Sequence, residues 1–105
     1  MQPGICTILF VNRGNMEAKK IKISGRVQGV GFRHFTVQNA RSLNLKGWVM
    51  NMPDGTVEAL IGGDPEDVET MMKKLHKGPA AARVDRVETN TAQADGLPDS
   101  FGVRR

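Results

Sequence analysis

The most regular alternation of apolar and polar residues lies between Lys19 and Val27. Apolar side chains at Ile21, Ile23 and Val27 share one face, and most positions between them are basic or polar. Because successive side chains of a strand point to opposite faces, this period of two predicts a β-strand with one buried face. The glycine-rich residues 28–31 that follow predict a tight turn.

Two later segments have helical periodicity, residues 32–43 and the segment that starts at Pro65. Asp64 is a favourable N-cap residue for the second helix, and proline suits its first position. Gly78 and Pro79 are expected to end this helix after a basic last turn. The apolar stripes of the two helices are expected to be Phe32, Val37, Ala40 and Leu43, and Val68, Met71, Met72 and Leu75.

Four more strands complete the pattern, and Pro53-Asp54-Gly55 predicts a hairpin turn between the first two of them. These strands are expected at residues 46–52, 56–61, 83–89 and 100–103, with a loop over residues 91–98. The element order is therefore β-α-β-β-α-β plus a terminal strand. This order predicts an α+β domain in which two helices pack on one face of an antiparallel sheet.

The same order predicts which distant segments meet. In this split β-α-β arrangement the first two strands are parallel, with another strand between them, so their carboxyl ends lie at the same edge of the sheet. The glycine-rich loop follows the first strand, and Asn51 lies near the end of the second. We therefore expect the loop and Asn51 to be neighbours.

Composition limits the classes of function. The 105 residues include 15 Lys and Arg against 11 Asp and Glu, a net charge of +4, and 39% apolar residues, which is typical of one globular domain. No apolar run approaches the roughly 18–20 residues of a membrane span. One Trp, four Phe and no Tyr leave few stacking platforms for nucleic acid, and the modest positive charge equally suits a small anionic substrate. The single cysteine, Cys6, excludes an internal disulfide and is expected to be a reduced thiol in the cytoplasm.

The first fifteen residues differ from the rest of the chain. Residues 5–11 form a short apolar run, but no basic residue precedes it and Pro3-Gly4 interrupts its start, so it is a poor signal peptide. Residues 1–15 are therefore expected to be an N-terminal extension, either an extra edge strand or a loosely held tail. Met16 is an alternative start, and the domain is placed at residues 16–105.

The main candidate for chemistry is the segment Gly25-Arg26-Val27-Gln28-Gly29-Val30-Gly31-Phe32-Arg33, which leaves a strand and enters a helix. Its glycines allow positive φ angles, so successive backbone N–H groups can point into one hollow. The helix start adds free N–H groups and the positive end of a dipole, and the guanidinium of Arg33 can fold over the same hollow. The alternative is a tight turn with Arg33 on the surface. The segment lacks the third glycine of a dinucleotide fingerprint and the Gly-Lys-Ser/Thr ending of a P-loop.

A second candidate is Asn51, near the end of a predicted strand. Its carboxamide can hold a water molecule through both its carbonyl and its amide group. The alternative is an asparagine that flanks the turn and hydrogen-bonds the hairpin backbone. His34 directly follows Arg33, and because neighbouring helical residues lie about 100° apart, it is expected to face solvent or to lie behind the residues that touch a substrate.

Together these segments resemble the acylphosphatase family. The resemblance covers nearly all of residues 16–105 and rests on long motifs. These are the loop Gly25–Arg33, the strand Gly47-Trp48-Val49-Met50-Asn51, the hairpin Asp54-Gly55-Thr56-Val57 and the closing Phe101-Gly102-Val103-Arg104. The resemblance implies a five-stranded ferredoxin-like α/β sandwich that hydrolyses the carboxyl–phosphate bond of acyl phosphates to a carboxylate and inorganic phosphate.

The resemblance also implies roles for single residues. Arg33 matches the phosphate-binding arginine of the family, and Asn51 matches the asparagine that orients the attacking water. The substrate-binding cradle would be formed by the backbone amides of Gln28, Gly29, Val30, Gly31 and Phe32. This chain departs from the family at Gly31, where some members have cysteine, and at Arg105, where tyrosine is common.

Acyl phosphate chemistry suits a site with so few residues. The leaving carboxylate has a conjugate acid with a pKa of about 4, so it needs no general acid at neutral pH. The loose phosphoryl transition state is stabilised mainly by positioning and electrostatics, which an arginine and loop amides can supply. We therefore expect an enzyme without cofactor or metal, acting as a cytoplasmic monomer on small acyl phosphates, with no nucleic-acid or membrane partner.

Two alternatives remain at the level of sequence. One is a non-enzymatic or accessory domain of the same fold, of the kind found in carbamoyl-phosphate-using hydrogenase maturation proteins. The other is an RNA-binding domain, because the same order of strands and helices builds RNA-recognition modules. The third predicted strand, residues 56–61, lacks the stacking aromatic residues that such modules carry, which argues against RNA.

Overall fold

The computed structural model describes residues 16–93 and 97–104. Residues 1–15, on which the expected edge strand or tail falls, lie outside the described residues. Within the described ranges, every strand and helix predicted from periodicity is present. The elements are β1 (Glu17–Arg26), α2 (Phe32–Ser42), β2 (Lys46–Asn51), β3 (Val57–Gly63), α3 (Pro65–Lys77), β4 (Arg83–Ala92) and β5 (Phe101–Val103).

The strands form one sheet in the order β4-β1-β3-β2-β5. β1 pairs antiparallel with both β3 and β4, and β3 pairs antiparallel with β2. β1 and β2 are therefore parallel with β3 between them, as predicted. The expected antiparallel sheet is correct for these four strands, but β5 pairs parallel with β2, so the whole sheet is mixed. The reason is geometric: β4 is antiparallel to β2, and the chain reverses once more before β5.

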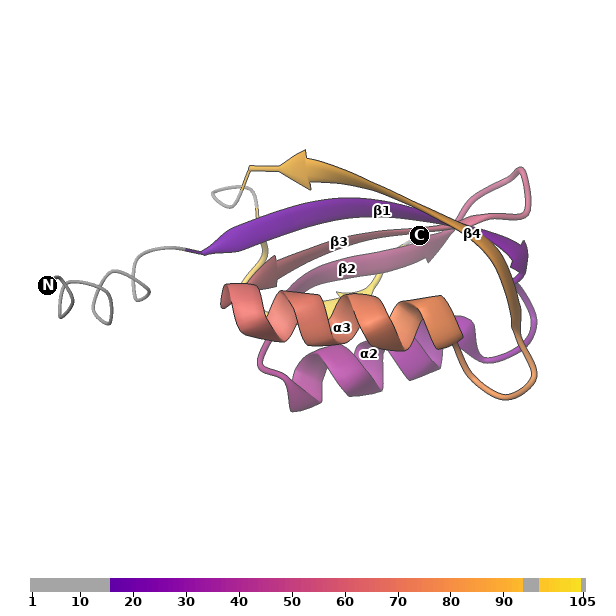
Figure 1. Ribbon diagram of the computed structural model, residues 1–105, viewed down its shortest axis with the longest axis horizontal. Helices are drawn as coiled ribbons and strands as arrows, with labels where there is room; N and C mark the ends of the chain where they lie inside the picture. The colour runs from indigo at the N-terminus through magenta and orange to yellow at the C-terminus, as the bar shows by residue number, and fades with distance from the viewer. Residues whose placement is uncertain (1–15, 94–96, 105) are drawn as a thin grey trace, which may run out of the picture.

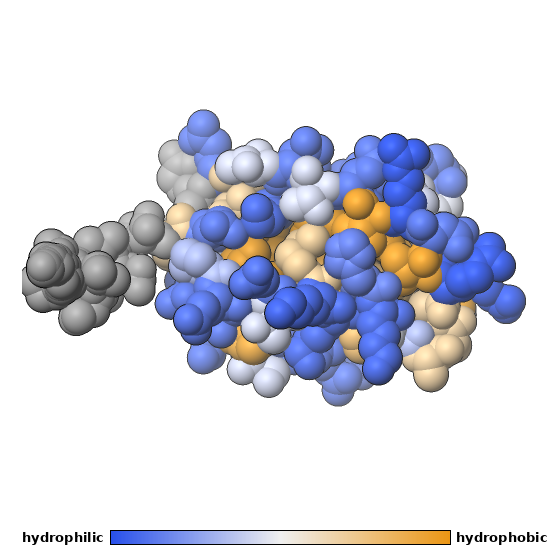
Figure 2. Space-filling model, in the orientation of Figure 1, coloured by the Kyte–Doolittle hydropathy of each residue, from blue (hydrophilic) through white to orange (hydrophobic). Residues whose placement is uncertain are grey.

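Both helices lie on the same face of the sheet, where Figure 1 shows them side by side. The core fills the layer between helices and sheet and is made of fully buried apolar side chains, among them Ile21, Ile23, Phe32, Val49, Val57, Ala59, Ile61, Val68, Met71 and Leu75. The outer surface in the same orientation is largely hydrophilic, with narrower apolar areas between the polar side chains (Figure 2). This distribution is the one that the alternating pattern of β1 and the helical stripes predict.

The helical stripes differ from the prediction in detail. Val37, Leu43 and Met72 are only half-buried and pack at the border of the core. Thr36 instead occupies a fully buried position on α2. Its hydroxyl donates a hydrogen bond to the carbonyl oxygen of Phe32, one turn earlier, at 2.8 Å. Because this bond satisfies the hydroxyl within its own helix, a polar residue is tolerated in the core.

The predicted loop over residues 91–98 is wrong at its start. β4 continues to Ala92, because Thr91 and Ala92 still pair with Lys19 and Ala18 of β1. The N-terminus of α3 is as expected, since the Asp64 carboxylate accepts a hydrogen bond from the backbone N–H of Glu66 at 3.1 Å. None of the described helices is both long and apolar enough to cross a membrane.

Candidate active site

A cavity of about 400 Å³ lies where the carboxyl ends of β1 and β2 meet α2. It brings together the glycine-rich loop and Asn51, which the chain order predicts to be neighbours. Five of the predicted site residues line it: Gly29, Gly31, Phe32, Arg33 and Asn51. The other lining residues are Val27, His34, Val37 and Val103, whereas the predicted Gln28 and Val30 are not among them.

The loop enters α2 through two glycines in the left-handed region. Gly29 has a φ of 74°, and Gly31, the N-cap residue of α2, has a φ of 81°. Side chains other than that of glycine rarely adopt this conformation, so these positions are needed for the path of the backbone. A Cβ atom at either glycine would meet no other atom within 4 Å. Glycine is therefore favoured here by the backbone conformation and not by a lack of space.

The N-terminus of α2 is left without a cap. Among the described residues no side chain hydrogen-bonds to it, and its first turn contains no acidic residue. α3 has the opposite arrangement, with Asp64 as a capping carboxylate and both Glu66 and Asp67 in its first turn. The cavity therefore lies at a helix start whose free N–H groups and positive dipole end are not neutralised by a carboxylate of the described residues.

Arg33 gives the cavity a positive charge. Arg33 is half-buried and lines the cavity from the first turn of α2, and no acidic residue is among the described residues around it. His34 is exposed, as expected, but it also lines the cavity, because the first turn of the helix borders the hollow. The local field therefore favours an anion.

Asn51, the last residue of β2, is half-buried and lines the same cavity. Its Oδ1 is the only buried side-chain oxygen or nitrogen of the described residues that lacks a hydrogen-bond partner. Leaving a buried acceptor unpaired costs about 1–3 kcal/mol. A water molecule that donates a hydrogen bond to this oxygen would satisfy it.

The side chain of Gln28 has a contact that the sequence did not predict. Its Nε2 donates hydrogen bonds to the carbonyl oxygens of Met52, at 2.8 Å, and Thr56, at 2.9 Å. The sequence pattern assigned Gln28 only a backbone amide in the cradle. Since its partners are carbonyl oxygens, which every residue has, no residue type in the hairpin could have indicated them.

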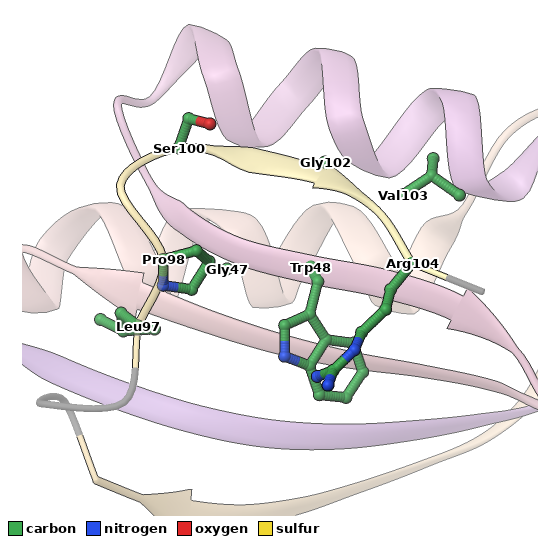
Figure 3. A pocket seen from close by; sticks show the side chains of 8 residues that line it. All are labelled: Gly47, Trp48, Leu97, Pro98, Ser100, Gly102, Val103 and Arg104. Atoms are coloured by element: carbon green, nitrogen blue, oxygen red, sulfur yellow. The ribbon is translucent and has the colours of Figure 1, made fainter.

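A second hollow, of about 470 Å³, involves β2 and β5 and is drawn in Figure 3. There the guanidinium of Arg104 lies over the indole ring of Trp48, 5.0 Å from the ring centroid. Leu97 and Pro98 form an apolar part of its wall. None of the predicted site residues lines this hollow.

Comparisons with known proteins show which family the chain belongs to. The sequence profile of the acylphosphatase family matches residues 19–103, which include the loop, Asn51 and β5. The chain belongs to the acylphosphatase family. An acylphosphatase of Thermococcus kodakarensis is 54% identical to it over 77 residues, which cover 73% of this chain and 85% of that relative.

Solved structures of acylphosphatases and related proteins share the fold. The crystal structure of acylphosphatase from Bacillus subtilis superposes with a TM-score of 0.81 at 30% identity, covering 85% of this chain and 99% of that one. Full-length HypF in its phosphate- and nucleotide-bound form contains a similar segment, with a TM-score of 0.76 at 26% identity over 86% of this chain and 12% of HypF. The expected ferredoxin-like α+β fold and an enzyme of the acylphosphatase type are therefore confirmed.

No described group of three or more His, Cys, Asp and Glu side chains lies close enough together to hold a metal ion. The groups available to a ligand at the acylphosphatase cavity are instead backbone amides, one guanidinium, one imidazole and one carboxamide. Each can donate a hydrogen bond to an anionic oxygen.

Proposed function

We propose that this acylphosphatase binds the phosphoryl group of its substrate at the N-terminus of α2 and hydrolyses it with a water molecule held by Asn51. The observation that carries the proposal is the uncapped start of α2, which shares one cavity with Arg33 and Asn51 and has no described carboxylate beside it. Three negative oxygens of a phosphoryl group match the donors that this cavity presents.

Phosphate binding is assigned to the backbone amides from Gln28 to Phe32 and to Arg33. The left-handed conformations of Gly29 and Gly31 support this assignment, because backbone nests that hold anions contain such residues. Arg33 adds a planar fork that suits two phosphate oxygens at once. Because the charge of the transition state is spread over these equatorial oxygens, the same donors stabilise it without reorganisation.

Asn51 is assigned the attacking water. A carboxamide cannot act as a base, but its carbonyl accepts a hydrogen bond from water and its amide donates one to a phosphoryl oxygen. The unpaired Oδ1 supports this role, since a bound water would supply the missing donor. The water oxygen bonds to phosphorus, and the bond between phosphorus and the acyl oxygen breaks, with its electron pair leaving on the carboxylate. One water proton passes to a phosphoryl oxygen, and the other stays on the attacking oxygen.

The acyl group is assigned to the apolar side of the cavity, between Val37 of α2 and Val103 of β5. Val103 is 48% exposed, and among the described residues only Met16 is another large apolar side chain with such exposure. A carboxylate leaves from this side without a proton, because its conjugate acid has a pKa of about 4. A phosphate monoester would release a far more basic alkoxide, so the site should discriminate strongly against monoesters.

The test is hydrolysis of benzoyl phosphate by the EDTA-treated protein, compared between the wild type and Arg33→Gln. We expect wild-type turnover to persist without added metal and Arg33→Gln to lose both turnover and inhibition by inorganic phosphate. Arg86→Gln is a matched control, because Arg86 is exposed on β4, where it pairs with Glu88. Unchanged activity in Arg33→Gln, or faster turnover of p-nitrophenyl phosphate than of benzoyl phosphate, would contradict the proposal.

We also propose a cytoplasmic monomer that acts on small molecules and has no nucleic-acid partner. The single cysteine and the modest charge of +4 support this proposal. Light scattering coupled to size-exclusion chromatography tests the oligomeric state. A shift in the electrophoretic mobility of RNA that weakens with added salt would contradict the absence of a nucleic-acid partner.

A further inference from the structure

The side chain of Gln28 joins two segments that are far apart in the sequence. Its Nε2 atom carries two hydrogens and donates to two acceptors, the carbonyl oxygens of Met52 at 2.8 Å and Thr56 at 2.9 Å. Both donors of the carboxamide are thus used on one hairpin. Met52 is the residue after Asn51, so the contact lies one peptide unit from the proposed water-binding side chain.

The hairpin that accepts these bonds is itself well ordered. The backbone N–H of Met52 donates to the carbonyl of Thr56 at 2.8 Å, and that of Gly55 donates to the carbonyl of Met52 at 3.1 Å. Asp54 Oδ1 accepts from both the backbone N–H of Thr56, at 3.0 Å, and its hydroxyl, at 2.6 Å. Gln28 therefore binds to acceptors whose positions are already set.

The loop on the other side packs against the core through Val30, but its two glycines have no side chains to pack. Gly29 and Gly31 have left-handed backbones and no atom near a would-be Cβ, so side-chain packing does not hold them. Gln28 stands between this stretch and the fully buried Val27. Among the side-chain hydrogen bonds of residues 16–93 and 97–104, those of Gln28 are the ones that tie the loop to the hairpin.

We propose that Gln28 is a positioning residue, whose side chain sets the distance between the phosphate cradle and Asn51. This inference rests on the proposed function, in which the cradle holds the phosphoryl group and Asn51 holds the water. In-line attack requires the reacting atoms to approach within roughly 3–3.5 Å, and a displacement of about 1 Å can cost 100-fold in rate. A loop and a strand end that move independently would lose this alignment while both sets of ligands remain.

The first variant is Gln28→Met, which keeps the length of the side chain and removes both donors. We expect kcat for benzoyl phosphate to fall by about 10- to 100-fold. The inhibition constant for inorganic phosphate should change by less than about 3-fold, because Arg33 and the loop amides remain. A loss of phosphate binding as large as the loss of kcat would overturn the inference.

Gln38→Met is the matched control, since Gln38 is exposed on α2 and does not line the cavity. It should leave kcat unchanged. A fall in kcat for Gln38→Met equal to that for Gln28→Met would overturn the inference, because the effect would then follow from the substitution type and not from the two hydrogen bonds.

A double-mutant cycle tests whether Gln28 acts through Asn51. In an Asn51→Ala background, Gln28→Met should lower the residual kcat by less than about 2-fold, because the group that it positions is absent. A full additional loss in that background would overturn the role of Gln28 and leave that of Asn51 intact. An Asn51→Ala variant with unchanged kcat would instead overturn the proposed function, and the role of Gln28 with it.

Gln28→Glu gives a readout that a purely structural role would not move. The ionised glutamate donates no hydrogen bond and faces two carbonyl oxygens, whereas its protonated form has one O–H donor. We expect the ratio of its kcat to that of the wild type to rise as the pH is lowered through the titration of this carboxyl. A ratio that stays flat while the variant remains folded would overturn the inference, and thermal unfolding at each pH checks the fold.

Discussion

Replacing Asn51 by valine should make the protein more stable and almost inactive. Oδ1 of Asn51 is buried and makes no hydrogen bond to the described residues, so its replacement removes no hydrogen bond within the protein. Valine removes this unpaired acceptor, and it also suits the end of a strand better than asparagine. We therefore expect the free energy of unfolding to rise by about 1 kcal/mol, which raises the Tm of a domain of this size by roughly 4–8 °C.

The same substitution removes the proposed water ligand. We expect kcat for benzoyl phosphate to fall by about 100-fold, because the water is no longer held in line. The Ki for inorganic phosphate should rise far less than kcat falls, because Asn51 gives up one donor whereas Arg33 and the amides at the start of α2 are unchanged. Opposite movements of stability and activity are typical of a group that is kept for catalysis at a cost in folding.

Two assays check the prediction. Thermal unfolding followed by circular dichroism gives Tm, and release of phosphate from benzoyl phosphate gives kcat. Asn90→Val is the control for strand propensity, because Asn90 is exposed on β4 and lies outside the active-site cavity. A lower Tm for Asn51→Val than for the wild type would refute the reasoning, since it would mean that the carboxamide contributes to folding.

Three further outcomes are expected. Hydrogen bonds from Thr56, helped by Lys22, lower the pKa of Asp54 below its usual 3.8. As the pH falls, the unfolded chain takes up a proton at Asp54 before the folded protein does. The stability that the ionised Asp54 contributes is therefore complete above about pH 3.8 and is lost as the pH falls through the pKa of the folded state. The difference in Tm between the wild type and Asp54→Asn should shrink over the same pH range. Thr36→Ser should destabilise the protein by about 1 kcal/mol in urea unfolding, because it deletes a buried methyl group, and Thr36→Val should cost less. Val103→Lys should lower kcat/KM for benzoyl phosphate more than for acetyl phosphate, and equal losses would remove Val103 from the acyl site.

Hydrophobic periodicity was sufficient to predict the fold where an element has one buried face. β1 and both helices have such a face, and their boundaries were predicted within one or two residues. β4 is an edge strand whose last residues are mostly exposed, so it shows no alternation there, and its end at Ala92 could not be found from the pattern. The buried Thr36 was missed for a related reason, because a hydroxyl that bonds within its own helix looks polar in the sequence.

The site was predictable to the extent that it depends on chain order and on backbone conformation. Parallel β1 and β2 bring the loop and Asn51 to one edge, and glycines mark the left-handed positions. The side-chain bonds of Gln28 and the presence of Val103 at the cavity could not be predicted. The bonds of Gln28 depend on carbonyl acceptors, which every residue has. The position of Val103 depends on the pairing of β5 with β2, which the sequence pattern does not determine.

The N-termini of α2 and α3 differ in capping and charge, and the difference follows from where each helix begins. α3 begins at an edge that holds no proposed site, and there Asp64, Glu66 and Asp67 satisfy and neutralise the helix start. α2 begins at the active-site cavity, where a capping carboxylate would occupy the place of the phosphoryl group. The N-cap residue of α2 is Gly31, and a capping side chain there would add only about a few tenths of a kcal/mol to stability, so leaving it out is a small cost. In the proposed function, a bound phosphoryl group would supply the missing acceptors and cap the helix.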